Sequence, residues 1–168
     1  MVVLVLIGIM TAVIVPEMRG TYEDALLRAT SRRLIDVFHL AYSRAVSFNQ
    51  IHLVHFDRLT GRYFIEKEGE NGFARARDIS GGEGELDRRI SIEIRKQDEA
   101  LASLTDPGSS TESEDPIEAR NRGQGFAFYS DGTADGGEIV LRDRDGFRLA
   151  LRINPVTARV RIIELERQ

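Results

Sequence analysis

The sequence opens with Met1-Val-Val-Leu-Val-Leu-Ile-Gly-Ile-Met-Thr-Ala-Val-Ile-Val15-Pro16, a run whose first fifteen residues carry no charge. Charged residues make up 30% of the 168-residue chain, so this run differs sharply from the rest. A helix that is apolar on every side must be enclosed all round by protein or lipid. As a helix, fifteen residues cover roughly 22 Å, which is less than the hydrocarbon core of a bilayer at about 30 Å.

We therefore expect residues 1–20 to form a hydrophobic stem, a transmembrane helix whose first apolar residues precede Met1. Two other interpretations are weaker. A secretory signal peptide needs a basic n-region and a small-residue cleavage site, and here valines follow Met1 directly. A core helix of a soluble protein would need more protein around it than the rest of this chain readily supplies. The membrane-stem residues are Val2, Leu4, Leu6, Ile7, Ile9, Val13, Ile14 and Pro16.

Beyond the stem, composition indicates one domain, residues 21–168, which is long enough to bury a core. The formal net charge of −4 argues against general affinity for nucleic acid, although a local basic patch remains compatible with it. The chain has no cysteine, which excludes a disulfide framework, a thiolate metal site and a cysteine nucleophile.

A helix is predicted for residues 21–49. Pro16 and Gly20 precede it, and because proline removes one helical hydrogen bond, we expect a kink or an end there. Apolar residues then recur at spacings of three, four and seven, which places them on one stripe of a helix. The helix should end at about Asn49. The stripe consists of Leu27, Leu34, Phe38, Ala41, Ala45 and Phe48.

Residues 50–168 are rich in strand patterns, so the predicted fold class is α+β, with the long helix packed on antiparallel sheet. We expect two small sheets, and we interpret Gly69–Gly84 as a loop because it is rich in glycine. The C-terminal strands follow one another as a meander. The predicted strands are Ile51–Phe56, Arg62–Lys67, Arg89–Arg95, Phe126–Tyr129, Glu138–Arg142, Phe147–Ile153 and Arg159–Leu165.

Residues 97–122 differ in kind. Gln97–Glu118 contains seven acidic residues and no basic one, together with two prolines and a Ser/Thr cluster. Low hydrophobicity with one sign of charge disfavours packing, so we predict a mobile, acidic insertion that folding does not require.

Two stretches make the sequence similar to a known family. The apolar run ending in Ala12-Val-Ile-Val-Pro16 resembles the stem of type IV pilin-like proteins. The segments Gly125–Thr133, Ile139–Leu141 and Ile153–Val160 resemble the C-terminal pattern of minor pseudopilins of type II secretion, the GspH/FimT kind, except that Ala158 stands where that pattern usually has glycine. The resemblance covers nearly the whole chain.

The resemblance implies a non-enzymatic structural subunit of a pseudopilus that serves protein secretion across the outer membrane. It implies a single-pass inner-membrane protein with its domain in the periplasm, processed by prepilin cleavage and methylation. Its partners would be other pseudopilins through the N-terminal helix, the secretion machinery and secreted substrate. The family's cleavage site and stem glutamate would precede Met1, so we expect the upstream DNA to continue in frame through about six mostly apolar codons.

No cofactor or metal site is expected. His39 lies in the helix, while His52 and His55 are three apart in a strand and so point to opposite faces. Asp143-Arg-Asp-Gly146 lacks the further ligands of a calcium loop and is better explained as a hairpin turn. No catalytic residue is predicted, and a membrane-tethered enzyme is the weakest interpretation.

Period-two alternation in the last two strands places arginines on one face and apolar residues on the other. This basic face is either a solvated sheet surface or a docking patch for an acidic partner. The alternative function that it suggests is a minor pilin of a type IV or competence pilus that binds DNA phosphates, although the overall charge makes nucleic acid the less favoured partner. The patch consists of Arg148, Arg152, Arg159 and Arg161.

Overall fold

A computed structural model describes residues 2–57, 59–69, 72–96 and 125–165 of the chain. In the first part of the helix, side chains are described only for Val3 and from Tyr22 onward. The predicted acidic insertion, residues 97–122, lies outside the described residues.

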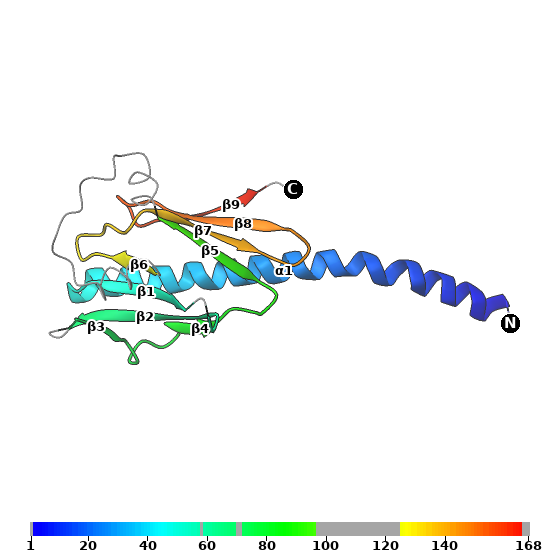
Figure 1. Cartoon of the computed structure of the whole chain (residues 1–168), viewed down its shortest axis with the longest axis horizontal. Helices are drawn as coiled ribbons and strands as arrows, with labels where there is room; N and C mark the ends of the chain where they lie inside the picture. Colours follow the sequence, from blue (N-terminus) through cyan, green and yellow to red (C-terminus); the bar gives the residue numbers. More distant parts are fainter. Residues whose placement is uncertain (1, 58, 70–71, 97–124, 166–168) are drawn as a thin grey trace.

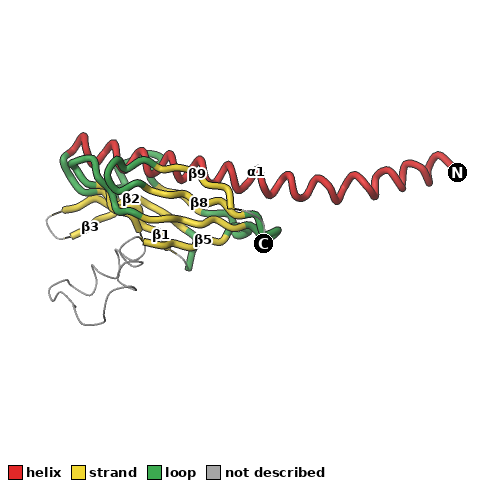
Figure 2. The backbone as a smooth tube through the Cα atoms, turned by 90° about the horizontal axis from the view of Figure 1, so that it is seen from above, coloured by secondary structure: helices red, strands yellow, loops and turns green. Residues whose placement is uncertain are grey.

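Helix α1 (Val2–Phe48) is a single helix of 47 residues, which at 1.5 Å per residue is about 70 Å long. The predicted long N-terminal helix is confirmed, and of the two effects expected at Pro16 and Gly20 an end does not occur, because α1 continues through both residues. A proline removes one i→i−4 hydrogen bond, and the helical hydrogen bonds on either side of it keep this stretch helical. Figures 1 and 2 show the N-terminal part of α1 projecting well beyond the sheets.

The C-terminal end of α1 was predicted correctly. Asn49 has a φ of 51°, the left-handed conformation that commonly ends helices, and asparagine tolerates it better than most residues. The amide of Gln50 donates to the carbonyl of Ala45 at 3.2 Å, which satisfies one of the carbonyls left without a helical partner. The chain then turns back into the first sheet.

The first sheet has the strand order β3-β2-β1-β6, with β4 also paired to β2. Its pairs are antiparallel, and the β1–β2 register places Val54 opposite Ile65 and Asp57 opposite Arg62. The strands are β1 (His52–Asp57), β2 (Arg62–Gly69), β3 (Gly72–Arg75), β4 (Glu83–Glu85) and β6 (Gly125–Phe128).

The second sheet has the order β5-β7-β8-β9 and is antiparallel throughout. Both sheets lie along the C-terminal half of α1 (Figure 1). The prediction of two small sheets against one helix is therefore confirmed. The strands are β5 (Ser91–Lys96), β7 (Gly137–Arg142), β8 (Arg148–Ile153) and β9 (Val160–Leu165).

Two details of the sheets were predicted wrongly. Gly69–Gly84 is not a plain loop, because it contains β3 and the start of β4. These short edge strands pair through their backbones and need no side-chain alternation. Glycine has a positive role here, since a Cβ at Gly84 would collide with the ring of Tyr63. Strand β6 also leaves the expected C-terminal meander and pairs with β1, with Val54 opposite Phe126.

The predicted helical stripe forms the core. Leu27, Leu34, Phe38, Ala41 and Ala45 are all fully buried. Phe48 is the exception: its side chain is 57% exposed and lies beneath the guanidinium of Arg44, 5.2 Å from the ring centroid. It occupies the last turn, where α1 ends and the chain departs for β1. The sequence pattern also missed Val37, which is buried at the edge of the stripe.

A polar cluster joins the two sheets. Asp135 accepts hydrogen bonds from the Tyr129 hydroxyl at 2.9 Å and from the backbone N–H of Ala127 at 3.2 Å. Lys96, at the end of β5, places its Nζ 3.3 Å from the same carboxylate and 5.8 Å from the ring centroid of Phe126. The Lys96 and Asp135 side chains are only 14% and 18% exposed, so this ion pair is well shielded from solvent.

Candidate docking surface

The face of the second sheet that points away from the helix gathers arginines from several strands. In an antiparallel sheet, residues directly opposite each other point to the same side. Arg152 on β8 stands opposite Glu138 on β7 and opposite Arg161 on β9. Arg148 stands opposite Arg142 in the same way. The outer face thus carries two transverse rows that contain arginine, one toward each end of the strands.

Two carboxylates on this face balance part of the charge, namely Glu138 and Glu93 on β5, which lies opposite Val140 and 2.8 Å from Arg95 Nη2. Arg152 approaches Glu138, with 3.6 Å between Nη2 and Oε2. Arg142, Arg159 and Arg161 are exposed, and no ion pair is found for them within the described ranges. Like charges directly opposite each other, as at Arg152 and Arg161, are unfavourable on an isolated sheet. This outer face is therefore electrostatically suited to an anionic partner.

Between the two arginine rows runs an apolar one. Val140, Ala150 and Ile163 are directly opposite one another across β7, β8 and β9. Val140 and Ala150 are buried, and Ile163 is partly buried. An apolar centre with arginine at the rim is the composition that protein–protein interfaces favour, since the core of an interface is depleted in other charged residues. We call this outer face of the second sheet, with its arginine rows, the arginine face.

A groove of about 730 Å³ lies where the arginine face meets the β8–β9 hairpin. Its cationic lining comes from Arg95, Arg152, Arg159 and Arg161, with Glu138 as its carboxylate, while the ammonium of Lys96, another lining residue, is paired with Asp135. The hairpin turn is held by Asn154, whose Oδ1 accepts from the amides of Val156 and Thr157 at 3.0 and 3.1 Å. This side-chain cap is typical of asparagine in turns and confirms the predicted hairpin.

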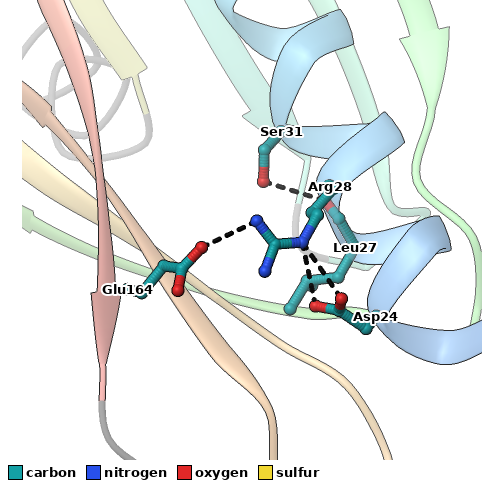
Figure 3. Close-up of polar contacts among 5 residues, drawn as sticks. All are labelled: Asp24, Leu27, Arg28, Ser31 and Glu164. Carbon is teal, nitrogen blue, oxygen red and sulfur yellow. Dashed lines mark hydrogen bonds and ion pairs between the residues drawn. The ribbon is translucent and has the colours of Figure 1, made fainter. Parts of the chain in front are cut away.

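The opposite face of β9 lies toward α1 (Figure 3). The side chain of Arg28 on the helix lies between two carboxylates: its Nε is 3.0 Å from Asp24 Oδ2, and its Nη1 is 2.7 Å from Glu164 Oε1. Hydrogen bonding to Asp24, followed by that to Glu164, raises the pKa of Arg28. One turn further along, Ser31 is buried and donates to the carbonyl of Leu27 at 2.8 Å. Of these contacts, the one between Arg28 and Glu164 connects the helix to the outermost strand, and the others lie within α1.

Ile162 shows how incompletely this face is covered. Its position opposite Leu151 places it on the helix side of the sheet, yet it is 44% exposed. The alternation of arginine with apolar residues along β9 was predicted correctly. The expectation that the apolar side of this strand is buried was wrong at Ile162. An edge strand has a neighbour on one side only, so its inward-facing residues are less enclosed than those of β8.

The other chemical candidates form no site. His52 is buried beside the carbonyl of Gln50, 3.0 Å from Nδ1, and His55 stacks on Phe64 with 5.0 Å between ring centroids. Across the described residues, no three histidines or acidic residues come close enough together to bind a metal ion. Asp143 accepts from the amide of Phe147 at 2.8 Å, as a hairpin-turn aspartate does.

The four arginines of the predicted patch lie on the arginine face, as their alternation implied. The prediction omitted Arg95 and Arg142, which contribute to the same face. The signal for Arg142 was present, because it alternates with Ile139 and Leu141. The sequence carried no signal that Arg95 joins this face, because that depends on the pairing of β5 with β7, a contact between segments far apart in the sequence.

The predicted stem residues all lie within α1, and their side chains are outside the described ones. Before Tyr22, the described side chain is that of Val3, which is 69% exposed. Within the described portion of the chain, no helix combines the length and the apolar character that crossing a bilayer requires.

Known structures resemble this fold. No protein-family profile matches the sequence, and no curated protein matches it either. Two solved structures of the minor pseudopilin EpsH from the type II secretion system of Vibrio cholerae do match. One superposes with a TM-score of 0.56 at 10% identity, covering 82% of this chain and 95% of the solved EpsH chain. The other has a TM-score of 0.57 at 11% identity and covers 88% and 99%. The chain therefore shares the α+β fold of these EpsH structures, one long N-terminal helix packed on antiparallel sheets.

Proposed function

We propose that this chain is a minor pseudopilin, a non-enzymatic structural subunit of a type II secretion pseudopilus. The observation that carries the proposal is the 47-residue helix α1, half of which projects beyond the sheets while the other half is buried against them. Such a projecting helix needs partners outside its own domain, because the sheets cover only its C-terminal part. The likeness to EpsH, across 95% and 99% of the two solved chains, supports the same role.

In this role the stem anchors the subunit in the inner membrane, with the domain in the periplasm, until assembly. It then packs against the stems of other pseudopilins in the core of a periplasmic pseudopilus. The arginine face remains on the domain surface, where it can contact the secretion machinery or a secreted substrate. In this proposal the arginine face and the apolar stem bind different partners.

The absence of cysteine from the sequence makes disulfide crosslinking a direct test. Val3→Cys places one thiol on the projecting helix, and Leu59→Cys places one at the β1–β2 hairpin tip, where the side chain is 98% exposed. Each variant is co-expressed with pseudopilins of a type II system that carry a cysteine in their stems. We expect membrane-associated mixed disulfides with Val3→Cys and not with the Leu59→Cys control.

Adding Leu6→Arg and Ile7→Arg to Val3→Cys should abolish the adducts, because two charges in an apolar stem disfavour both bilayer insertion and stem packing. The proposal fails if Val3→Cys gives no adduct, or if the two arginines leave the yield unchanged. Recovery of the protein with the membrane fraction, measured on the same samples, separates failure of anchoring from failure of assembly.

One observation favours a second candidate, a minor pilin that binds DNA: the excess of arginine on the arginine face. Binding to phosphates would be steeply salt-dependent. A gel-shift assay with duplex DNA tests it by replacing four arginines with glutamine, namely Arg148, Arg152, Arg159 and Arg161. DNA binding by this face is supported if the four replacements abolish the gel shift and a matched variant retains it. The matched variant replaces four exposed arginines elsewhere, namely Arg32, Arg33, Arg62 and Arg77.

A further inference from the structure

Strand β9 is the outermost strand of the second sheet. It pairs with β8 along its whole length, from Ile153 opposite Val160 to Arg148 opposite Leu165. Among the described residues, no strand pairs with its other side. An open edge presents a row of backbone donors and acceptors that another extended chain can use, and proteins often blunt such edges with charge.

The hairpin contacts show which residues of β9 present these groups. The amide of Asn154 donates to the carbonyl of Arg159 at 2.9 Å, so Arg159 directs its carbonyl toward the β8 side. Along an antiparallel strand, residues alternate between bonding to one neighbour and facing the other way. Counting from Arg159, the backbone groups of Val160, Ile162 and Glu164 point away from β8, toward the open edge.

The side chains beside this edge differ on its two faces. Arg159 and Arg161 lie on the arginine face, exposed and next to the 730 Å³ groove. Ile162 lies on the helix side, is 44% exposed and also lines the groove. Glu164 is already paired with Arg28. A strand placed beside β9 would therefore meet cations on one face and an uncovered aliphatic side chain on the other.

We propose that the free edge of β9 binds an extended acidic segment of a partner protein as an additional strand. Carboxylates alternating with aliphatic residues would pair with Arg159 and Arg161 on one face and cover Ile162 on the other. Main-chain hydrogen bonds would supply affinity, and the alternating side chains would supply specificity. Charge complementarity and the exposed Ile162 select this occupant, since DNA would use neither the backbone row nor the isoleucine.

This inference deepens the docking role proposed above by naming the chemistry of the partner. It is tested with the full chain in detergent micelles and a fluorescent, end-blocked peptide in which glutamate alternates with valine. Binding is followed by fluorescence anisotropy. The control peptides are one with lysine in place of glutamate and one whose amides along one edge are methylated. We expect only the unmethylated acidic peptide to bind, in a salt-sensitive manner.

The sharpest variant is Ile162→Pro. Because the amide of Ile162 points away from β8, proline there removes a donor from the open edge and leaves the β8–β9 ladder intact, as edge strands tolerate. We expect the Kd for the acidic peptide to rise by about tenfold or more, since the new ladder loses one hydrogen bond and meets the proline ring. Ile162→Ala keeps the amide and should weaken binding less.

Circular dichroism on both variants verifies that the fold is retained, and Val160→Pro, at another outward position, provides a second test if Ile162→Pro unfolds. The inference is wrong if the methylated peptide binds as well as the unmethylated one, or if the proline variants bind normally. It is also wrong if a duplex oligonucleotide binds and the acidic peptide does not. Any of these outcomes leaves stem-mediated assembly standing, because crosslinking at Val3 does not involve β9.

Discussion

Truncation of Phe38 to alanine should be the most damaging single change in the interface between α1 and the first sheet. The Phe38 side chain is fully buried, and its ring centroid lies 6.2 Å from that of Phe56, 6.3 Å from that of Phe126 and 5.8 Å from that of Phe128. Phe→Ala substitutions in cores cost about 3–5 kcal/mol, from lost burial plus the cavity left behind. The loss is a large part of the 5–15 kcal/mol that typically separates folded from unfolded protein.

For a domain of this size, each kcal/mol shifts the melting temperature by roughly 2–4 °C, so we expect Phe38→Ala to lower it by about 6–20 °C. Far-UV circular dichroism of the full chain in detergent, with urea and heat as denaturants, measures the change. The matched control is Phe48→Ala on the same helix, where the side chain is 57% exposed. Exposed sites usually change stability by no more than about 0.5 kcal/mol.

The ratio between the two variants tests the reasoning more strictly than either value. If Phe48→Ala destabilised the protein as much as Phe38→Ala, the assignment of the helix face to the core would be wrong. A Phe38→Ala cost below about 1 kcal/mol would mean that the aromatic cluster repacks to fill the space. The melting temperature of Phe38→Leu should lie between those of Phe38→Ala and the wild type, because leucine retains most of the apolar volume.

Three further predictions concern backbone, charge and ion pairs. Gly61 and Ala158 occupy corresponding hairpin positions in the left-handed conformation, with φ angles of 69° and 50°, which glycine adopts without strain. Gly61→Ala should therefore destabilise the fold by about 1 kcal/mol, and Ala158→Gly should raise the urea midpoint. Burial raises the pKa of Glu66, and its Oε2 finds no hydrogen-bond partner among the described residues. The folded state therefore holds the Glu66 proton more tightly than the unfolded state, and the ionised carboxylate destabilises the fold above the raised pKa. Glu66→Gln should raise the melting temperature at pH 7. This gain should shrink as the pH falls toward 4.5, the ordinary pKa of glutamate. Arg28→Ala and Glu164→Ala should each lower the melting temperature slightly and non-additively, and high salt should remove the coupling because both side chains are exposed.

Sequence reasoning succeeded wherever the decisive interaction was local. The helical stripe from Leu27 to Ala45 could be predicted because side chains that are neighbours on a helix are three or four residues apart in the sequence. The turns at Asp57 and Asn154 between predicted strands are local in the same sense, because each side chain accepts hydrogen bonds from amides two or three residues ahead. It failed at Phe48, which continues the stripe but occupies a turn where α1 leaves the core.

The same contrast holds for the candidate docking surface. Alternation along β8 and β9 was sufficient to place Arg148, Arg152 and Arg161 on one face, since a strand's side-chain period is two. Alternation could not show that Arg95 joins them, because β5 reaches β7 from far away in the sequence. Nor could it show that Glu164 meets Arg28, a contact across 136 residues.

By itself, then, the sequence determined the long helix, the side of it that is buried, the strands other than β3 and β4, and the alternating arginines, because each depends on the spacing of nearby residues. The tertiary structure alone decided that β6 pairs with β1, that β5 opens the second sheet and that β9 is left at its edge. Strand pairing is chosen by packing between distant segments that share the same two-residue period. That periodicity is identical for an edge strand and a central one, and only the presence or absence of a neighbour distinguishes them.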